Sequence, residues 1–421
     1  MNQAGFSPAD ILTPKGVDMT KWSVVACDQY TSEPDYWERV RRTVGEAPSA
    51  LHLVYPEVWL DAPDRAKRIE DINRAMRAYL DGGVFETLLE SYVYIERTLA
   101  PGRTRRGLLG KIDLERYDYT AGSQSPIRPT EGTVEGRLPP RVQIRQDAPL
   151  EAPHVLLLLD DARRTVIEPL GRRTGSMRPL YRFNLMEGGG EIRGWLCDEG
   201  SRRAVDAALE ALSAEVCGYG ERFAPGKGPL FIAVGDGNHS LATAKACFER
   251  LKRTLPREEW ERHPARYALV ELCNVHDEAL TFEPIHRALF GVDPDRVLAA
   301  LRERYQAADY DNGGQSFEYV TGSRRGRLYL EEPSSALPVG TLQEFLDDYL
   351  REHGGRLDYI HGSQVVERLC KQPDTIGFLL PAMRKNQLFS TVLTEGALPR
   401  KTFSMGEAHE KRYYLECRKI R

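Results

Sequence analysis

The spacing of apolar positions predicts a chain in which strands dominate the middle and helices flank them. Apolar residues recurring every three or four positions predict helices over residues 64–83, 202–218, 293–306 and 341–355. Short runs rich in branched and aromatic residues predict strands over residues 91–99, 106–114, 154–161, 164–170, 229–235, 266–273 and 316–322. Strands grouped before helices, and then mixed with them, favour an α+β class with mixed, largely antiparallel sheets over a doubly wound sheet.

The length of the chain predicts more than one domain. Its 421 residues exceed what most single cores hold. The segment 221–229 is polar and rich in Gly and Pro, and it is the best candidate for a linker. We therefore predict a strand-rich N-terminal domain over residues 1–225 and a C-terminal α+β domain over residues 226–421.

A turn with the sequence GDGNH, at residues 235–239, lies between the apolar run PLFIAV and a helical pattern that starts near Ser240. The unpaired N–H groups at a helix start, together with the helix dipole, form a natural anion site. Asp236 would hold a cation there or act as a base, and His239 would move a proton or bind phosphate. The same residues also suit a plain turn, with Asp236 and Asn238 as turn formers and Ser240 as the helix N-cap. The residues alone favour neither interpretation.

Three other segments carry candidate chemistry. The loop PTEGT offers Glu131 and Thr133. The segment FEPIHRAL places His286 beside Arg287 after a proline, where we expect a helix to begin, and PRKTFSMG places Lys401 between turn residues. Each segment also suits a purely structural role, so the three matter together only if they meet in space.

Composition narrows the choice of partner. The chain is 41% hydrophobic and 29% charged, as ordinary globular proteins are, and its net charge is −4. It therefore has no overall basic field to attract nucleic acid. Arginine outnumbers lysine by 46 to 12, but the arginines are spread along the whole chain. We expect a small-molecule ligand and no nucleic acid, and the oligomeric state stays open.

The well-known cofactor and hydrolase motifs are missing from the sequence. No CxxC, HExxH or GxSxG occurs, and no GxGxxG follows a predicted strand, so we expect no zinc, haem or NAD. The segment GERFAPGKG resembles a phosphate loop, but its glycine spacing is wrong and its strand follows the loop instead of preceding it. The seven scattered cysteines suit reduced thiols in a cytoplasm. The first twelve residues predict no signal peptide, and the aliphatic run 155–159 is too short to span a bilayer, so we expect a cytoplasmic protein.

Several motifs in one order identify a resemblance. They are VVACDQYTSEPDYWERV (24–40), QSPIRPTEGTV (124–134), FIAVGDGNHSLATA (231–244), CNVHDEALTFEPIHRAL (273–289), LDYIHG (357–362) and LPRKTFSMG (398–406). Together they resemble the bacterial and archaeal family called domain of unknown function 1015, and the likeness covers nearly the whole chain. The family has no settled activity.

In that family the segment that corresponds to GDGNH is itself similar to the phosphate-binding signature of the ParB/sulfiredoxin superfamily. This superfamily includes free serine kinases. The resemblance implies that nucleotide phosphates lie over Gly237, Asn238, His239 and Ser240, beside Asp236. It also implies that an early acidic residue, here Asp28, activates the acceptor. His286 and Arg287 match a Pro-x-His-Arg element of the family, and Lys401 matches its late lysine.

Two positions depart from the family pattern. Asn238 stands where histidine is usual, and Ser240 stands where the family has an arginine that would clamp a phosphate. Arg287, Arg128 or Lys401 could replace that arginine. Otherwise this branch binds a different anion or has lost phosphoryl transfer.

The leading hypothesis is a small-molecule enzyme of the phosphoryl-transfer class that uses ATP or ADP with Mg²⁺, as a nucleotide-dependent kinase does. Asp236, Asp28 or Glu131 would hold the metal, with Asp236 the foremost candidate, or orient the acceptor hydroxyl. His239 would transfer a proton. A nucleotide- or metabolite-binding regulator without turnover, and a hydrolase of a phosphate or acyl bond, remain as alternatives.

Overall fold

The computed structural model describes residues 4–421 and divides into two compact units. The first unit contains the chain up to Leu280 together with Glu407–Arg421, and the second contains Thr281–Gly406. The expected boundary between residues 225 and 226 lies inside the first unit, because the next strand, β12 (Ile232–Asp236), is hydrogen-bonded between β9 and β7.

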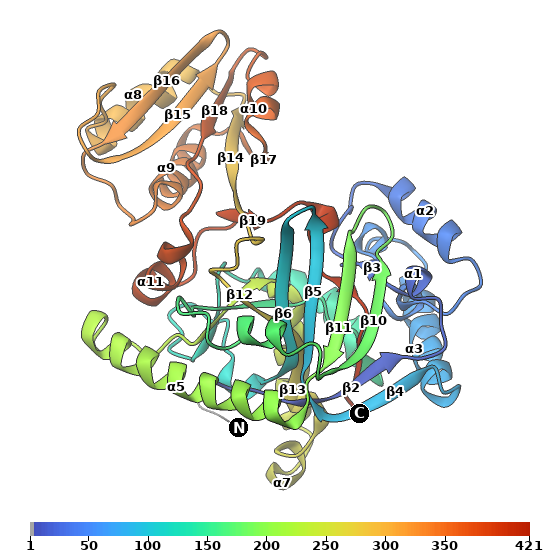
Figure 1. Ribbon diagram of the computed structural model, residues 1–421. Coiled ribbons are helices and arrows are strands. Elements are labelled where there is room, and N and C mark those ends of the chain that lie inside the picture. The colour runs from blue at the N-terminus through green and yellow to red at the C-terminus, as the bar shows by residue number, and fades with distance from the viewer. Residues whose placement is uncertain (1–3) are drawn as a thin grey trace. The chain divides into compact units, whose positions relative to one another are not determined.

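A nine-stranded mixed sheet forms the centre of the first unit. Its order is β10-β11-β5-β6-β13-β9-β12-β7, with β1 beside β6, and Figure 1 shows β5, β6, β10 and β11 side by side. The pairs β13–β9 and β12–β7 are parallel and the other pairs of this sheet are antiparallel. The remaining bounds are β1 Phe6–Ser7, β5 Val93–Ala100, β6 Arg103–Asp113, β7 Ile127–Pro129, β9 Leu156–Leu159, β10 Arg178–Asn184, β11 Glu191–Leu196 and β13 Tyr267–Asn274.

Strand β9 places the helix that follows the GDGNH turn. Its four leucines are buried, as expected of a strand covered on both faces. Leu157 and Leu159 pack in one apolar cluster with Leu241 and Phe248 of helix α6 (Asn238–Lys252). The apolar face of α6 therefore holds the helix against the sheet, and the start of α6 lies where β12 ends.

The other helices of the first unit include two that the spacing of apolar residues predicts. Residues 64–83 form α3 and residues 202–218 lie in the longer α5, whose first turn is capped by Asp198, which accepts from the Ser201 N–H at 2.7 Å. The helix bounds are α1 Met19–Trp22, α2 Pro34–Val44, α3 Arg65–Asp81, α4 Leu138–Arg145, α5 Glu199–Phe223 and α7 Arg257–Trp260.

The predicted strand over residues 164–170 is wrong. The carboxylate of Asp161 accepts hydrogen bonds from the N–H groups of Thr165 and Val166, at 2.6 and 2.9 Å. These bonds fold the chain into a turn, and a short 3₁₀ helix, Glu168–Arg172, follows. An aspartate just before the apolar residues thus overrides their strand propensity.

The last fifteen residues complete the first unit by pairing with distant segments. Here β20 (Tyr413–Tyr414) pairs with β3 (Val24–Val25), and β21 (Arg418–Lys419) pairs with β8 (Leu150–Glu151). A further two-stranded sheet joins β2 (Ala9–Pro14) to β4 (Phe85–Ser91). The residues that follow Gly406 therefore contribute to the same unit as the GDGNH turn.

The second unit contains a six-stranded sheet in the order β16-β15-β18-β14-β17, with β19 also paired to β14. The predicted helix at FEPIHRAL is wrong, because β14 spans Phe282–Phe290 and pairs with β17, β18 and β19. The predicted helices 293–306 and 341–355 are confirmed as α8 and α9. The bounds are α8 Pro294–Tyr305, β15 Gln315–Thr321, β16 Arg324–Leu330, α9 Pro338–His353, β17 Arg356–His361, α10 Ser363–Leu369, β18 Thr375–Leu379, α11 Lys385–Glu395 and β19 Phe403–Met405.

The fold class is α+β with mixed, largely antiparallel sheets, as predicted. Within residues 4–421, none of the helices has the length and apolar composition that crossing a membrane requires.

Candidate functional site

The GDGNH turn joins β12 to α6 through a position, Gly237, that favours glycine. After β12 the chain turns at Gly237, which has φ = 80°, and α6 begins at Asn238 without a side-chain cap. A Cβ at Gly237 would lie 3.1 Å from Val155 Cα and 3.5 Å from His154 Cδ2. The plain-turn interpretation made Ser240 the helix N-cap, but Gly237 takes that position. The first backbone N–H groups of α6 are therefore available to an anion or to solvent.

The loop after β7 lies beside this turn. The Thr130 hydroxyl donates to the Val234 carbonyl at 2.7 Å, which fixes the end of β7 next to the end of β12 and brings the loop with Glu131 to the same edge. The hydroxyl of Thr133 and the side-chain oxygen of Asn238 are buried without a hydrogen-bond partner among the described residues. Buried polar atoms are normally paired, so these two suit a ligand.

Asp28 meets a histidine that the sequence analysis did not identify. Its carboxylate Oδ2 lies 3.8 Å from His154 Nε2, and Asp28 keeps 30% of its side-chain surface exposed while His154 is buried. Burial alone would raise the pKa of Asp28, but His154, a hydrogen bond from Gln29 and the charge of Lys411 outweigh it and leave the pKa lowered. Asp28 is therefore ionised at neutral pH.

A hydrogen-bond chain fixes the orientation of the His154 ring. The Tyr414 hydroxyl accepts from the Cys27 N–H at 3.1 Å and lies 2.8 Å from His154 Nδ1. Burial holds the pKa of Tyr414 well above its ordinary value, so the hydroxyl keeps its proton. The contact with Nδ1 fixes the ring so that Nε2 faces Asp28.

Lys411 supplies a cation at the turn. It is buried, and its Nζ lies 3.5 Å from Asp236 Oδ2, while its charge also lowers the pKa of Asp28. Its backbone is held by Arg97, which donates to the carbonyls of His409 and Lys411 at 2.6 and 2.5 Å. The ammonium group thus occupies a fixed position near both carboxylates.

A half-buried ion pair between Arg141 of α4 and Glu57 supports the Asp28 segment. Arg141 donates to both carboxylate oxygens of Glu57, at 2.8 and 2.5 Å, and the Glu57 N–H donates to the Cys27 carbonyl at 2.8 Å. Two parallel bonds fix orientation better than one. The neighbour of Asp28 is therefore anchored to the helix α4, which packs against α6.

Arg128 does not present its guanidinium as a clamp. It is buried, and its terminal nitrogens donate to the Gly228 and Ser123 carbonyls at 2.7 and 3.3 Å. These bonds tie β7 to the segment that precedes β12. The expectation that Arg128 replaces the missing arginine is not supported, and Lys411 is the cation that the structure places at the turn.

His286, Arg287 and Lys401 lie in the second unit. His286 Nδ1 accepts from the Leu380 N–H at 3.1 Å, and burial, Arg287 and His361 lower its pKa. The Arg287 side chain is fully buried, donates to the carbonyls of Ile285, Arg400 and Lys401, and lies over the Tyr359 ring. Such an occupied guanidinium has no surface left for a phosphate, whereas Lys401 is exposed, with φ = 58°.

The site residues that sequence reasoning missed are His154, Lys411 and Tyr414. His154 stands in APHVLLLL with no motif around it, and Lys411 and Tyr414 lie more than 170 residues from the turn. Their contacts are long-range, so neither spacing nor periodicity carries a signal for them. No group of three or more His, Cys, Asp or Glu side chains that could hold a metal occurs within residues 4–421.

This α+β protein, with a strand–turn–helix site on a mixed sheet, belongs to the family described as "Protein of unknown function (DUF1015)", which matches residues 11–349. The resemblance expected from the sequence is therefore confirmed. Among curated proteins, none shows significant sequence similarity to this chain.

The solved structures that are similar to this chain include the free serine kinases expected as distant relatives. A free serine kinase in complex with AMP is 12% identical, with a TM-score of 0.38, over 72% of this chain and 93% of that one. The C-terminally truncated SbnI from Staphylococcus aureus is 10% identical, with a TM-score of 0.36, over 71% and 82%. A conserved hypothetical protein from Pyrococcus furiosus is 11% identical, with a TM-score of 0.34, over 71% and 91%.

Proposed function

We propose that this protein transfers a phosphoryl group between a nucleotide and the hydroxyl of a small molecule. The observation that carries the proposal is the meeting of Asp28, His154 and Lys411 at the uncapped start of α6. A fixed cation, an ionised carboxylate and free backbone donors at one point are the parts that phosphoryl transfer requires.

The start of α6 would hold the phosphates. Its first N–H groups and its dipole favour negative charge, and Gly237 allows the close approach that a side chain would block. Lys411 would neutralise part of the phosphate charge. Asn238 and Thr133, whose side-chain oxygens have no partner in the described part of the chain, would contact the ligand as well.

Asp28 would orient the acceptor hydroxyl and take its proton. Its lowered pKa makes it a weak base, which suits a loose phosphoryl-transfer transition state, where positioning matters more than base strength. His154 would act as a positioning residue, because its Nε2 faces the Asp28 carboxylate at 3.8 Å and Tyr414 fixes the ring. His239, in the first turn of α6, is retained as a second proton-transfer candidate.

Asp236 suits a magnesium ion that arrives with the nucleotide. Its Oδ2 is buried, has no hydrogen-bond partner within residues 4–421 and lies 3.5 Å from Lys411 Nζ. Mg²⁺ is commonly bound through one or two carboxylates plus substrate phosphates, so a complete protein cage is not required. The ion would offset charge on the transferred group, while Asp236 would hold it at the turn.

The test begins with binding. ATP and ADP are titrated calorimetrically with and without Mg²⁺, and turnover is followed by phosphorus NMR in the presence of a pool of hydroxylated metabolites. The proposal predicts binding and a phosphorylated product. Binding without turnover would instead indicate the nucleotide-binding regulator, and release of inorganic phosphate without an acceptor would indicate the hydrolase. Absence of nucleotide binding would refute both the phosphoryl-transfer enzyme and the nucleotide-binding regulator.

Substitutions assign the roles. D28N should keep nucleotide binding and lose turnover by about 100-fold or more, the typical size of a general-base contribution. H154Q should lower kcat with little change in KM and move the acid limb of the pH profile upward, because His154 lowers the pKa of Asp28. The matched control is D160N, which breaks another aspartate–histidine pair, Asp160–His276 at 2.7 Å, at the opposite end of β9. Equal losses of turnover in D28N and D160N would contradict the role assigned to Asp28.

A further inference from the structure

Arg412 is a buried charged residue to which the proposed mechanism gives no role. Its Nε donates to Glu271 Oε2 and its Nη2 donates to Glu416 Oε2, both at 2.8 Å. Its Nη1 donates to the carbonyl of Pro153. Glu271 belongs to β13, Glu416 to the C-terminal segment, and Pro153 to the chain between β8 and β9. One guanidinium therefore joins three segments that are distant from one another in the sequence.

The carbonyl that Arg412 binds belongs to the residue just before His154. Lys411, the cation at the GDGNH turn, directly precedes Arg412 in the chain. Tyr414 follows two residues later, and its hydroxyl lies 2.8 Å from His154 Nδ1. The C-terminal segment thus contacts the chain around His154 twice, through the Arg412 guanidinium and through the Tyr414 hydroxyl. A shift between these two segments would change the placement of both His154 and Lys411.

The charges around Arg412 are balanced within the protein. Glu271 also pairs with Arg105, whose Nη2 lies 3.2 Å from Glu271 Oε1. The group therefore contains two guanidinium groups and two carboxylates, all of them buried, and it requires no ligand as a counterion. Buried ion pairs are weak evidence for stability, because well-packed apolar residues often serve as well. A guanidinium with its donors fixed in several directions is instead suited to holding segments in a set orientation.

We propose that Arg412 is a positioning residue that holds His154 and Lys411 in place around the GDGNH turn. Groups that act on a substrate must be held by neighbours that are themselves fixed by packing and hydrogen bonds, and Arg412 meets this condition. The expected effect on turnover rests on the proposed phosphoryl-transfer function, whereas the placement of His154 can be measured without any activity.

Histidine-selective nitrogen-15 NMR on the full-length protein tests the placement of His154. R412K keeps the positive charge but loses the fork of donors, so the hold on the Pro153 carbonyl should weaken. The contact between Tyr414 and His154 should then weaken as well. We expect the Nδ1 resonance of His154, assigned with H154Q, to move toward the position that it takes in Y414F.

R418K is the matched control for a loss of stability alone. Arg418 is also buried in the C-terminal segment, and it donates to Glu151 and to two backbone carbonyls. R418K should therefore lower the thermal midpoint as R412K does. It should leave the His154 resonance at its wild-type position, because the contacts of Arg418 lie on β8 and near the start of β13.

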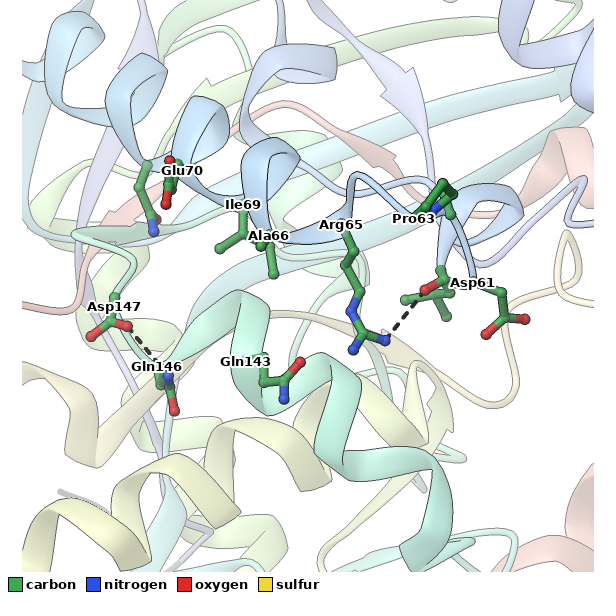
Figure 2. Close-up of a pocket in the computed structure, with 12 residues that line it drawn as sticks. Asp61, Pro63, Arg65, Ala66, Ile69, Glu70, Gln143, Gln146 and Asp147 are labelled. Carbon is green, nitrogen blue, oxygen red and sulfur yellow. Dashed lines mark hydrogen bonds between the residues drawn. The ribbon is translucent and has the colours of Figure 1, made fainter.

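A second control changes an arginine that is far from these contacts. Arg65 lines a cavity of about 740 Å³ between α3 and the end of α4, shown in Figure 2, and its Nη1 donates to the Leu60 carbonyl at 3.4 Å. None of the residues of the proposed phosphoryl-transfer site lines this cavity. R65K should therefore change neither the thermal midpoint nor the His154 resonance.

Turnover separates the role of Arg412 from the proposed function. With ATP, Mg²⁺ and the pool of hydroxylated metabolites, R412K should lower kcat by about tenfold or more, because small displacements of acting groups are costly, and R418K should not lower it. A wild-type protein without turnover would refute the proposed function, and the NMR comparison would still decide the placement of His154. A moved resonance with unchanged kcat would refute the positioning role.

E416Q covers the case in which R412K does not fold. It keeps Arg412 but removes the charge of one of its partners, so the His154 resonance should move in the same direction as in R412K and by less. An unchanged His154 resonance in both R412K and E416Q, or an equal change in R418K, would overturn the proposal.

Discussion

Replacing Gly237 by alanine tests whether the start of α6 is shaped for a ligand. The residue has φ = 80°, and a left-handed backbone costs a non-glycine residue about 1–2 kcal/mol. The added Cβ would also lie 3.1 Å from both Cα and Cγ2 of Val155, which is too close without a shift of the turn. Overpacking of this kind adds about 1–3 kcal/mol. We therefore expect G237A to lose about 2–5 kcal/mol of unfolding free energy.

Gly83 provides a matched control, because it has φ = 69° and no atom within 4 Å of an added Cβ. G83A should lose only the backbone part, about 1–2 kcal/mol. Chemical denaturation measures both variants, and calorimetric titration with ATP and Mg²⁺ measures binding. ATP affinity should fall about tenfold or more in G237A and stay unchanged in G83A. If the two variants lose equal stability and both keep wild-type affinity, the close approach at Gly237 has no functional meaning.

Three further substitutions probe buried charges of the first unit. K411M should weaken ATP binding by about tenfold or more, and it should move the acid limb of the kcat/KM profile upward, because the Lys411 charge lowers the pKa of Asp28. R97M leaves the carbonyls of Gly189, His409 and Lys411 without their donor, so denaturation should show a loss of about 3 kcal/mol or more. Burial raises the pKa of Glu151, but Arg418 and Arg145 outweigh this effect and hold the pKa below the ordinary 4.5. The resulting stability is complete above pH 4.5 and is lost as the pH falls below it, so E151Q should be less stable at pH 7 and flatten the acid side of a thermal-midpoint profile.

The sequence predicts those parts of the fold that local patterns determine. Helix α3 follows from its apolar spacing and β9 from its run of leucines, since both patterns report burial directly. The pattern fails where long-range pairing decides the structure. The segment that contains His286 follows a proline and suits a helix start, yet it forms β14, because three other strands of the second unit pair with it.

The candidate site likewise has a part that local sequence predicts and a part that it does not. The GDGNH turn is visible in the sequence because a strand, two glycines and a helix are contiguous. Its environment is not visible, since His154 comes from the segment just before β9 and Tyr414 from β20 near the end of the chain. These side chains act through contacts across 260 residues of sequence, as the His154–Tyr414 hydrogen bond shows.

The position of Lys411 gives a physical account of the serine at position 240. In the resemblance to the DUF1015 family, an arginine in the first turn of the helix would hold a phosphate, and this chain has Ser240 there. Lys411 places an ammonium group at the same turn from a segment that Arg97 fixes by hydrogen bonds to its backbone. A fixed lysine supplies charge without the two-pronged geometry of arginine. The packing of the C-terminal segment therefore determines where the cation of this site lies. K411R should keep the positive charge but displace it from its position beside Asp236.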